Sequence, residues 1–90
     1  VLRKPEQDAS DGEDARSALL QLAYGLTQQE ANVALRIAAG RSPEEICTDL
    51  GLSIHTVRTH LKRSYDKVGV QGQTELAARI MGGPVGWLSA

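Results

Sequence analysis

Apolar residues recur three and four positions apart along this 90-residue chain, which is the spacing of residues on one face of an α-helix. The clearest run covers residues 54–68, between Ser53, a good N-cap residue, and Gly69, a residue favoured just after a helix. Its apolar positions are Ile54, Val57, Leu61 and Val68. The other side carries His55, Arg58, Thr59, Lys62 and Arg63. The run therefore predicts a helix with one face in a core and one basic face in solvent.

Two shorter helices are predicted directly before this one. Residues 27–30, Thr-Gln-Gln-Glu, form a capping box, and apolar residues follow at helical spacing as far as Gly40. Residues 42–45, Ser-Pro-Glu-Glu, form a second box, and Gly51 ends the helix that starts there. A helix, a short glycine turn and the basic helix 54–68 together form the helix-turn-helix arrangement.

The N-terminal part of the chain has a weaker pattern. Residues 1–9 lack periodicity and contain a proline, so we expect them to be a linker or a disordered end. Residues 10–25 are predicted to form a leading helix that starts with a third capping box, Ser10 with Glu13. The expected buried stripe of this helix consists of Ala15, Ala18, Leu19, Leu22 and Ala23.

The C-terminal part contains one more helix and a tail. A short helix is predicted over residues 74–81, with Leu76 and Ile80 facing the core. The residues of this helix expected to stay partly exposed are Ala77, Ala78 and Met81. Two glycines and a proline end the helix, and residues 82–90 are expected to form a tail in which Trp87 covers an apolar edge.

The composition favours one small helical domain. The chain has one tryptophan, two tyrosines and no phenylalanine, so its core must be built from aliphatic and small residues. Its alanine and leucine residues favour helices, so we expect an all-α fold without a sheet. A chain of 90 residues can form a core of three or four helices but is too small for most enzyme clefts.

The formal net charge is −1, but the charges are unevenly distributed along the chain. Residues 1–26 hold three basic and five acidic side chains, and residues 27–50 hold two basic and four acidic ones. Residues 51–70 hold one acidic side chain, Asp66, and four basic ones, Arg58, Lys62, Arg63 and Lys67. Positive charge is therefore concentrated on the predicted helix 54–68, as on a surface that binds nucleic acid.

Cellular location is indicated by cysteine content and by the lack of membrane signals. Cys47 is the single cysteine, so no internal disulfide can form and a reducing, cytoplasmic compartment is expected. No apolar run approaches the length of a membrane span and no signal-peptide pattern is present, so we expect no membrane partner. The chain begins at Val1 rather than at methionine, which suggests a piece of a longer protein.

The sequence does not indicate catalytic or metal chemistry. His55 and His60 are five residues apart on the predicted helix, so their side chains diverge by about 140° and cannot share a metal. No Ser/His/Asp set, carboxylate pair or phosphate-binding glycine loop is recognisable. We therefore expect no enzyme, no catalytic residue, no metal and no cofactor.

Many residues at fixed spacings run through residues 26–81. They are Leu26, Thr27, Glu30, Ala38, Gly40, Ser42, Glu45, Ile46, Leu50, Gly51, Ser53, Thr56, Val57, Arg58, His60, Leu61, Tyr65, Lys67, Gly69, Val70, Thr74, Glu75 and Leu76. Together they resemble the LuxR/GerE-type (NarL/FixJ-like) helix-turn-helix DNA-binding domain of bacterial transcription regulators. The resemblance implies a four-helix fold, here preceded by an additional N-terminal helix or linker. It also implies sequence-specific binding of double-stranded DNA by a C-terminal output domain, with the third helix, 54–68, in the major groove.

The resemblance also implies roles for individual residues and partners. Carried over by position, base contacts fall on Arg58, Thr59 and Lys62, and a further base contact is expected from His55 on the same face. Contacts to the DNA backbone fall on Ser53, Thr56, Arg63 and Lys67, and a dimer interface falls on Ala77, Ala78 and Met81. The implied partners are double-stranded DNA, a second copy of the chain on that DNA, an upstream sensor or receiver domain, and RNA polymerase.

Some residues depart from the family pattern, and two other functions stay open. Ser64 stands where the family usually has an aliphatic core residue, so Ser64→Ile is expected to stabilise the fold unless the serine hydroxyl bonds to the His60 carbonyl. Gln73 replaces a usual arginine. The acidic pair Glu44-Glu45 suits a helical protein-interaction module that has lost DNA affinity. A promoter-binding domain like region four of sigma factors is the other alternative.

Overall fold

Helices make up nearly all of the described chain. The computed structural model describes the backbone of residues 5–82 and the side chains of residues 15–82. Within that part there are five helices and no strand, which confirms the predicted all-α fold. They are α1 (Pro5–Tyr24), α2 (Gln28–Ala38), α3 (Pro43–Leu50), α4 (Ile54–Val68) and α5 (Gln73–Met81). None of these helices is long and apolar enough to cross a membrane. The edge-covering role predicted for Trp87 falls outside the described residues.

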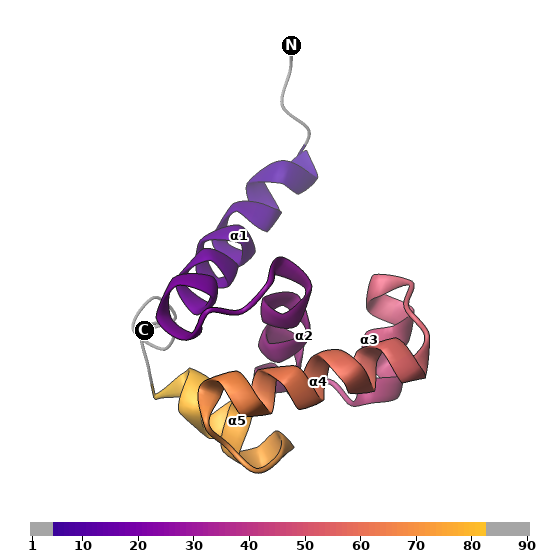
Figure 1. Cartoon of the computed structure of the whole chain (residues 1–90). Helices are drawn as coiled ribbons and strands as arrows, with labels where there is room; N and C mark the ends of the chain where they lie inside the picture. Colours follow the sequence, from indigo (N-terminus) through magenta and orange to yellow (C-terminus); the bar gives the residue numbers. More distant parts are fainter. Residues whose placement is uncertain (1–4, 83–90) are drawn as a thin grey trace.

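The central element of the fold is α2, which packs against α1, α4 and α5. Its side chains that are at most 4% exposed are Glu30, Ala31, Val33, Ala34 and Ile37. Figure 1 shows α4 lying across the outside of α2, with α3 beside its first half and α5 beside its last turns. The buried face of α2 is wide because helices cover it from several directions.

The first helix begins earlier than predicted. Residues 5–9, which we expected to belong to a linker, are helical, and α1 starts at Pro5 rather than at Ser10. Proline suits the first position of a helix, because its fixed φ angle is helical and its missing N–H would have no partner there. The linker prediction is therefore wrong for residues 5–9.

The buried side of α1 also differs from the predicted stripe. Ser17 and Leu20 are 4% and 1% exposed, whereas Leu22 is 84% exposed. Ala15, Ala18 and Ala23 are exposed as well, and Leu19 is half-buried. Since α1 packs mainly on α2, it buries one narrow side, and turning Leu20 into the core removes more apolar surface from water than turning the alanines inward.

The predicted capping boxes of α2 and α3 are both present. Thr27 Oγ1 accepts a hydrogen bond from the Glu30 N–H at 3.2 Å, and Glu30 Oε1 accepts one from the Thr27 N–H at 2.9 Å. Ser42 and Glu45 form the same reciprocal pair at 3.1 and 2.9 Å. Gly51 ends α3 with a φ angle of 67°, a left-handed conformation that glycine adopts without steric cost. The helix-turn-helix predicted from the sequence is thus confirmed in α3 and α4.

Ser64 lies where α4 approaches the backbone of α2. Its side chain is 0% exposed, and its hydroxyl donates a hydrogen bond to the His60 carbonyl at 2.8 Å. The same oxygen lies 3.5 Å from the carbonyl oxygen of Glu30 in α2. The hydroxyl of Ser64 is therefore satisfied, and its small side chain allows a close contact between α4 and α2. A larger aliphatic residue at this position is thus expected to destabilise the fold, contrary to the expectation from the sequence.

Ser64→Ile should lower the free energy of unfolding by roughly 1–3 kcal/mol, because the larger side chain must displace α2 or adopt a strained rotamer. Urea or thermal unfolding measures this loss. Ser64→Ala is the control, since it removes the hydroxyl without adding volume and should cost about 1 kcal/mol or less. A more stable isoleucine variant would show that the space beside Ser64 can accept it.

Candidate nucleic-acid interface

The two sides of α4 match the sequence pattern, except that Ile54, which was predicted to face the core, is only half-buried. Its buried side consists of Val57, Leu61, Ser64 and Val68, and its exposed side includes His55, Arg58, Lys62, Arg63 and Asp66. Ser53 caps the start of α4 by accepting the Thr56 N–H at 3.1 Å. Gly69 ends α4 with a φ angle of 84°. Local signals therefore define both ends of α4, and hence which residues belong to its exposed side.

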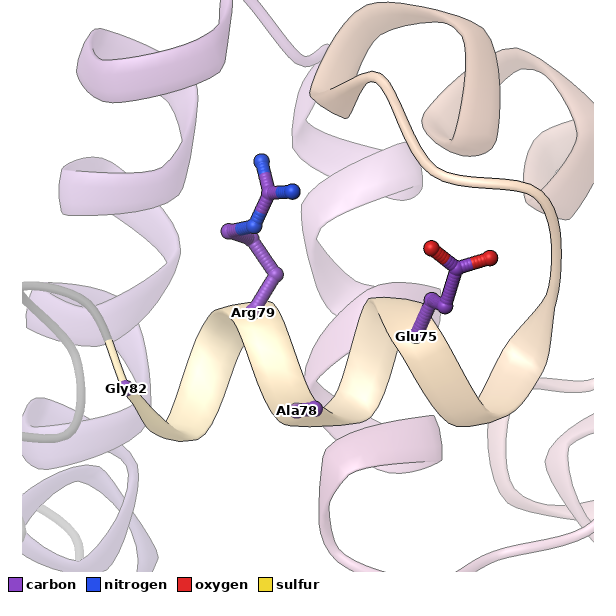
Figure 2. A pocket seen from close by; sticks show the side chains of 4 residues that line it. All are labelled: Glu75, Ala78, Arg79 and Gly82. Atoms are coloured by element: carbon purple, nitrogen blue, oxygen red, sulfur yellow. The ribbon is translucent and has the colours of Figure 1, made fainter.

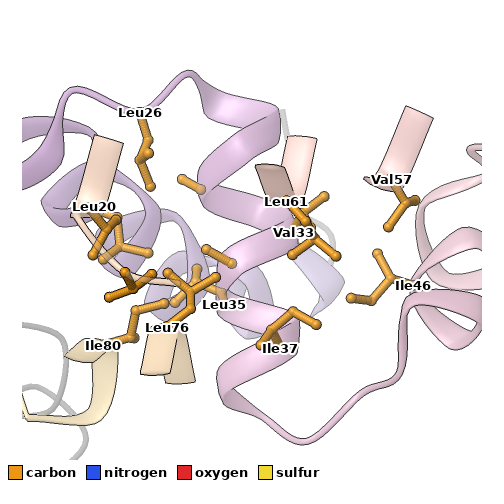
Figure 3. Close-up of a cluster of buried hydrophobic side chains, with 14 residues drawn as sticks. Leu20, Leu26, Val33, Leu35, Ile37, Ile46, Val57, Leu61, Leu76 and Ile80 are labelled. Atoms are coloured by element: carbon orange, nitrogen blue, oxygen red, sulfur yellow. The ribbon is translucent and has the colours of Figure 1, made fainter. Parts of the chain in front are cut away.

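Apolar packing fixes how α4 lies on its neighbours. Ile46 of α3 and Val57 of α4 are each 0% exposed and lie beside each other in Figure 3. Leu61 of α4 lies beside Val33 of α2 in the same cluster. These contacts hold α4 to both α2 and α3, so the short turn that contains Gly51 does not have to set the helix direction alone.

Hydrogen bonding separates the basic residues of α4 into two groups. Lys67 donates to Glu30 Oε1 at 2.7 Å. Within the part of the chain whose side chains are described, Arg58, Lys62 and Arg63 form no hydrogen bond and no ion pair. An unpaired surface cation can bind an external anion without first breaking an internal contact. The exposed side of α4 therefore presents three cations ready for an anionic ligand.

The acidic residues of α3 are largely neutralised by one arginine. Arg41 donates to both carboxylate oxygens of Asp49, at 2.9 and 2.7 Å, and to Glu45 at 3.3 Å. The hydrogen bonds from Arg41 to Asp49 lower the pKa of Asp49. The pKa of Glu45 is also lowered, mainly by the hydrogen bond from the Ser42 N–H and then by the charge of Arg41. Both carboxylates thus stay ionised and paired, which reduces the repulsion that α3 would exert on a nearby phosphate.

Hydroxyl groups at the start of α4 are partly used inside the protein. The Ser53 hydroxyl donates to Thr56 Oγ1 at 3.0 Å, so the Thr56 hydroxyl proton remains free to be donated outward. Thr59 Oγ1 donates to the His55 carbonyl at 3.0 Å. An external contact by Thr59 must therefore use its methyl group or the remaining lone pair of its oxygen.

Lys67 has a partner that the sequence did not indicate. Its ammonium contacts Glu30 Oε1, the same oxygen that accepts the Thr27 N–H in the α2 cap. The Glu30 side chain is 1% exposed and that of Lys67 is 37% exposed. The two residues are 37 positions apart, so no local pattern could pair them. This ion pair ties the last turn of α4 to the first turn of α2, and it engages the charge of a residue predicted to contact the DNA backbone.

The pKa of Glu30 reflects this environment. Burial alone raises it, but the hydrogen bond from Lys67 and the backbone N–H of Thr27 outweigh burial, so the pKa is lowered. A lowered folded-state pKa stabilises the protein at pH values above the unfolded-state value, and that contribution is lost as the pH falls through the folded-state pKa. The ion pair therefore favours the folded state at neutral pH and not in acid.

The surface of α5 is less polar and contains a shallow hollow. Ala78 is exposed and Met81 is 55% exposed, whereas Ala77 is half-buried against the core. The hollow has a volume of about 400 Å³ and is lined by Glu75, Ala78, Arg79 and Gly82. Figure 2 shows Glu75 and Arg79 projecting from the same side of α5, so an acidic and a basic side chain lie one helical turn apart beside the hollow.

Comparison with known families gives one match that spans most of the fold. A model of bacterial regulatory proteins, luxR family, matches residues 24–80. The match begins at the last residue of α1 and includes α2, α3, α4 and most of α5. It therefore covers the helix-turn-helix and every residue of α4 described above.

Several proteins named as transcriptional regulators are similar to this chain. The transcriptional regulatory protein UhpA of Escherichia coli is 41% identical over 58 residues, which is 64% of this chain and 30% of UhpA. GfsR of Streptomyces halstedii, named as a probable HTH-type transcriptional regulator, is 32% identical over 79 residues, 88% of this chain and 32% of GfsR. The probable transcriptional regulatory protein NarL of Mycobacterium tuberculosis is 34% identical over 68 residues, 76% of this chain and 32% of NarL. The chain thus spans about a third of the length of these relatives. No solved structure gave a significant match.

Lys67→Met should lower the free energy of unfolding by about 1–3 kcal/mol at pH 7, because it leaves the buried Glu30 carboxylate without its cation. Urea unfolding at several pH values measures the loss. The loss should shrink as the pH falls below about 4.3, the ordinary glutamate pKa, since a protonated Glu30 needs no cation. Lys62→Met is the matched control: it removes an unpaired lysine from the same helix and should change stability by less than about 0.5 kcal/mol. Equal losses in both variants would contradict a stabilising ion pair.

Proposed function

We propose that this chain, which belongs to the luxR family of bacterial regulatory proteins, binds double-stranded DNA sequence-specifically with α4 in the major groove. The single observation that carries the proposal is the row of unpaired cations along the exposed side of α4, Arg58, Lys62 and Arg63. A DNA duplex is a dense row of phosphates, and its major groove is wide enough for one α-helix. The family is one of regulatory proteins and not of enzymes, in agreement with this role.

Base contacts are proposed for the middle of the exposed side. Arg58 and Lys62 are one helical turn apart, so both can reach into one groove. Arginine can bind the O6 and N7 atoms of a guanine with two hydrogen bonds, and lysine can bind the same edge with one charge. The methyl group of Thr59 can contact a thymine methyl, and His55 lies one turn before Thr59 on the same side.

Backbone contacts are proposed for the edges of α4. Ser53 and Thr56 at its start can meet one phosphate, with the free proton of Thr56 as the donor. Arg63 carries an exposed, unpaired charge and is the best candidate for a purely electrostatic contact. For Lys67 we propose a positioning role through Glu30 in place of a strong phosphate contact.

Dimerisation on DNA is proposed to use the hollow on α5. In a two-fold dimer with antiparallel α5 helices, the small Ala78 allows close approach, and Met81 and the half-buried Ala77 add apolar contact. The same symmetry brings Glu75 of one copy near Arg79 of the other, so opposite charges meet on both sides. The interface would be small, so paired half-sites on DNA would supply much of the stability.

The full-length protein is proposed to carry an upstream sensor or receiver domain and to act on transcription, with RNA polymerase as a further partner. Support comes from the named relatives, which are transcriptional regulators about three times as long as the matched segment. The surface of α3 gives only partial support to the alternative of a protein-interaction module, and it does not bear on the alternative of a domain like region four of sigma factors. Of the acidic pair Glu44-Glu45 that suggested an interaction module, Glu45 is paired with Arg41, whereas Glu44 is exposed and has no partner among the described side chains.

Arg58→Ala and Arg63→Ala should weaken DNA binding in different ways. Arg58→Ala should cost roughly 1–3 kcal/mol on the preferred site and relax the preference at one base pair. Arg63→Ala should weaken all sequences alike and reduce the salt slope of binding by about one unit. Selection on randomised sites and titrations at several salt concentrations measure both effects. If the unaltered protein binds neither selected nor random DNA, the interaction-module alternative replaces this proposal.

Ala78→Glu should weaken binding to a fragment with two half-sites by at least about tenfold, because it places two additional carboxylates at the symmetric interface. Binding to a single half-site should not change. Ala18→Glu, on the exposed side of α1, is the matched control and should affect neither fragment. Unchanged affinity and stoichiometry in Ala78→Glu would place the dimer contact elsewhere.

A further inference from the structure

A groove runs along one flank of α4, between the beginnings of α3 and α5. It has a volume of about 470 Å³ and is lined by Pro43, Arg58, Leu61, Lys62, Tyr65 and Gln73. Residues 58, 61, 62 and 65 come from two successive turns of α4, while Pro43 and Gln73 are the first residues of α3 and α5. Three helices therefore meet at this groove.

The polar lining of the groove consists of hydrogen-bond donors that have no partner inside the described protein. Among the residues with described side chains, no hydrogen bond or ion pair involves the side chains of Arg58, Lys62, Tyr65 or Gln73. By contrast, Arg41, Lys67 and Arg79 all bind internal acceptors. No acidic residue lines the groove. Unpaired donors with two positive charges and no carboxylate favour an anionic ligand.

We propose that this groove binds a phosphate of the DNA backbone, held by the Tyr65 hydroxyl and the Gln73 amide beside the base-reading residues Arg58 and Lys62. The inference rests on the proposed function, since it takes α4 to lie in the major groove. It adds two contacts, Tyr65 and Gln73, to the expected set, and Gln73 extends the DNA-binding surface from α4 to the start of α5.

The shape of the major groove favours a phosphate at this place. A helix with its side chains is about 10–12 Å wide, and the major groove of DNA is about 12 Å wide. The flanks of a helix inserted into the major groove therefore face the sugar-phosphate backbones on either side. Arg58, Lys62 and Tyr65 lie on one such flank of α4. Side chains that line this flank can therefore meet a phosphate while the front of the helix meets base edges.

Two further features suit an anion here. Burial raises the pKa of Tyr65, so its phenol stays protonated at neutral pH and can donate a hydrogen bond. The N-cap of α5 is Gly72, which makes no side-chain hydrogen bond to the first turn. The N–H groups beside Gln73 are therefore not capped by a side chain, and they add a partial positive charge to the end of the groove.

Gln73→Arg tests the proposal by adding a charge inside the groove. It should tighten binding to selected and random DNA alike by about three- to tenfold at low salt and raise the salt slope by about one unit, because one more phosphate is neutralised. The control is Leu22→Arg, which adds the same charge on the 84% exposed position of α1 and should leave the salt slope unchanged. Fluorescence anisotropy with labelled duplexes at several salt concentrations measures both variants.

Tyr65→Phe provides an independent loss-of-contact measurement. It keeps the ring that packs against the core and removes only the hydroxyl, so binding should weaken by about two- to tenfold on all sequences without a change in thermal stability. If Gln73→Arg behaves like Leu22→Arg and Tyr65→Phe binds like the unaltered protein, the phosphate site is refuted while DNA binding itself stands. If the unaltered protein does not bind DNA, the proposed function and the phosphate site both fail.

Discussion

The contact between α2 and α4 is the constraint on which the exposed basic surface depends. Val33 and Leu61 pack in the core between the two helices, and Ser64 is small enough to let their backbones approach. The ion pair between Lys67 and Glu30 then holds the last turn of α4 to the first turn of α2. Without these contacts, α4 would keep its sequence pattern but lose its fixed direction, and a row of cations can match a row of phosphates only when its direction is fixed.

The charges of this small domain fall into structural and available groups. Arg41 and Lys67 each neutralise carboxylates and connect elements, so they contribute to stability and to positioning. Arg58, Lys62 and Arg63 have no internal partner among the described side chains and face solvent. A net charge of −1 is therefore compatible with an anion-binding surface, because Glu45 and Asp49 of α3 are paired with Arg41 and oppose it less.

Packing against α2 distinguishes positions that look alike in the sequence. Leu20 and Leu22 are two residues apart in α1, yet one is 1% and the other 84% exposed. Ser64 lies on the apolar face of α4 and is as deeply buried as Val57. In both cases the contact with α2 decides which residue suits the position. The narrow contact between α1 and α2 buries Leu20 but not Leu22, and the close contact between α4 and α2 requires a small residue at position 64.

The sequence alone determined the helices and turns of residues 26–81, because caps, glycine stops and helical spacing act within a few residues of each other. The boxes at Thr27 and Ser42 and the left-handed Gly51 are local signals, and all three are present. The same signals, with the family resemblance, placed the basic side of α4. Only the tertiary structure decided which cations are free, that Lys67 binds Glu30, and that Tyr65 and Gln73 line one groove with Arg58. These contacts join residues from different helices, and a linear pattern does not encode how far apart such residues lie in space.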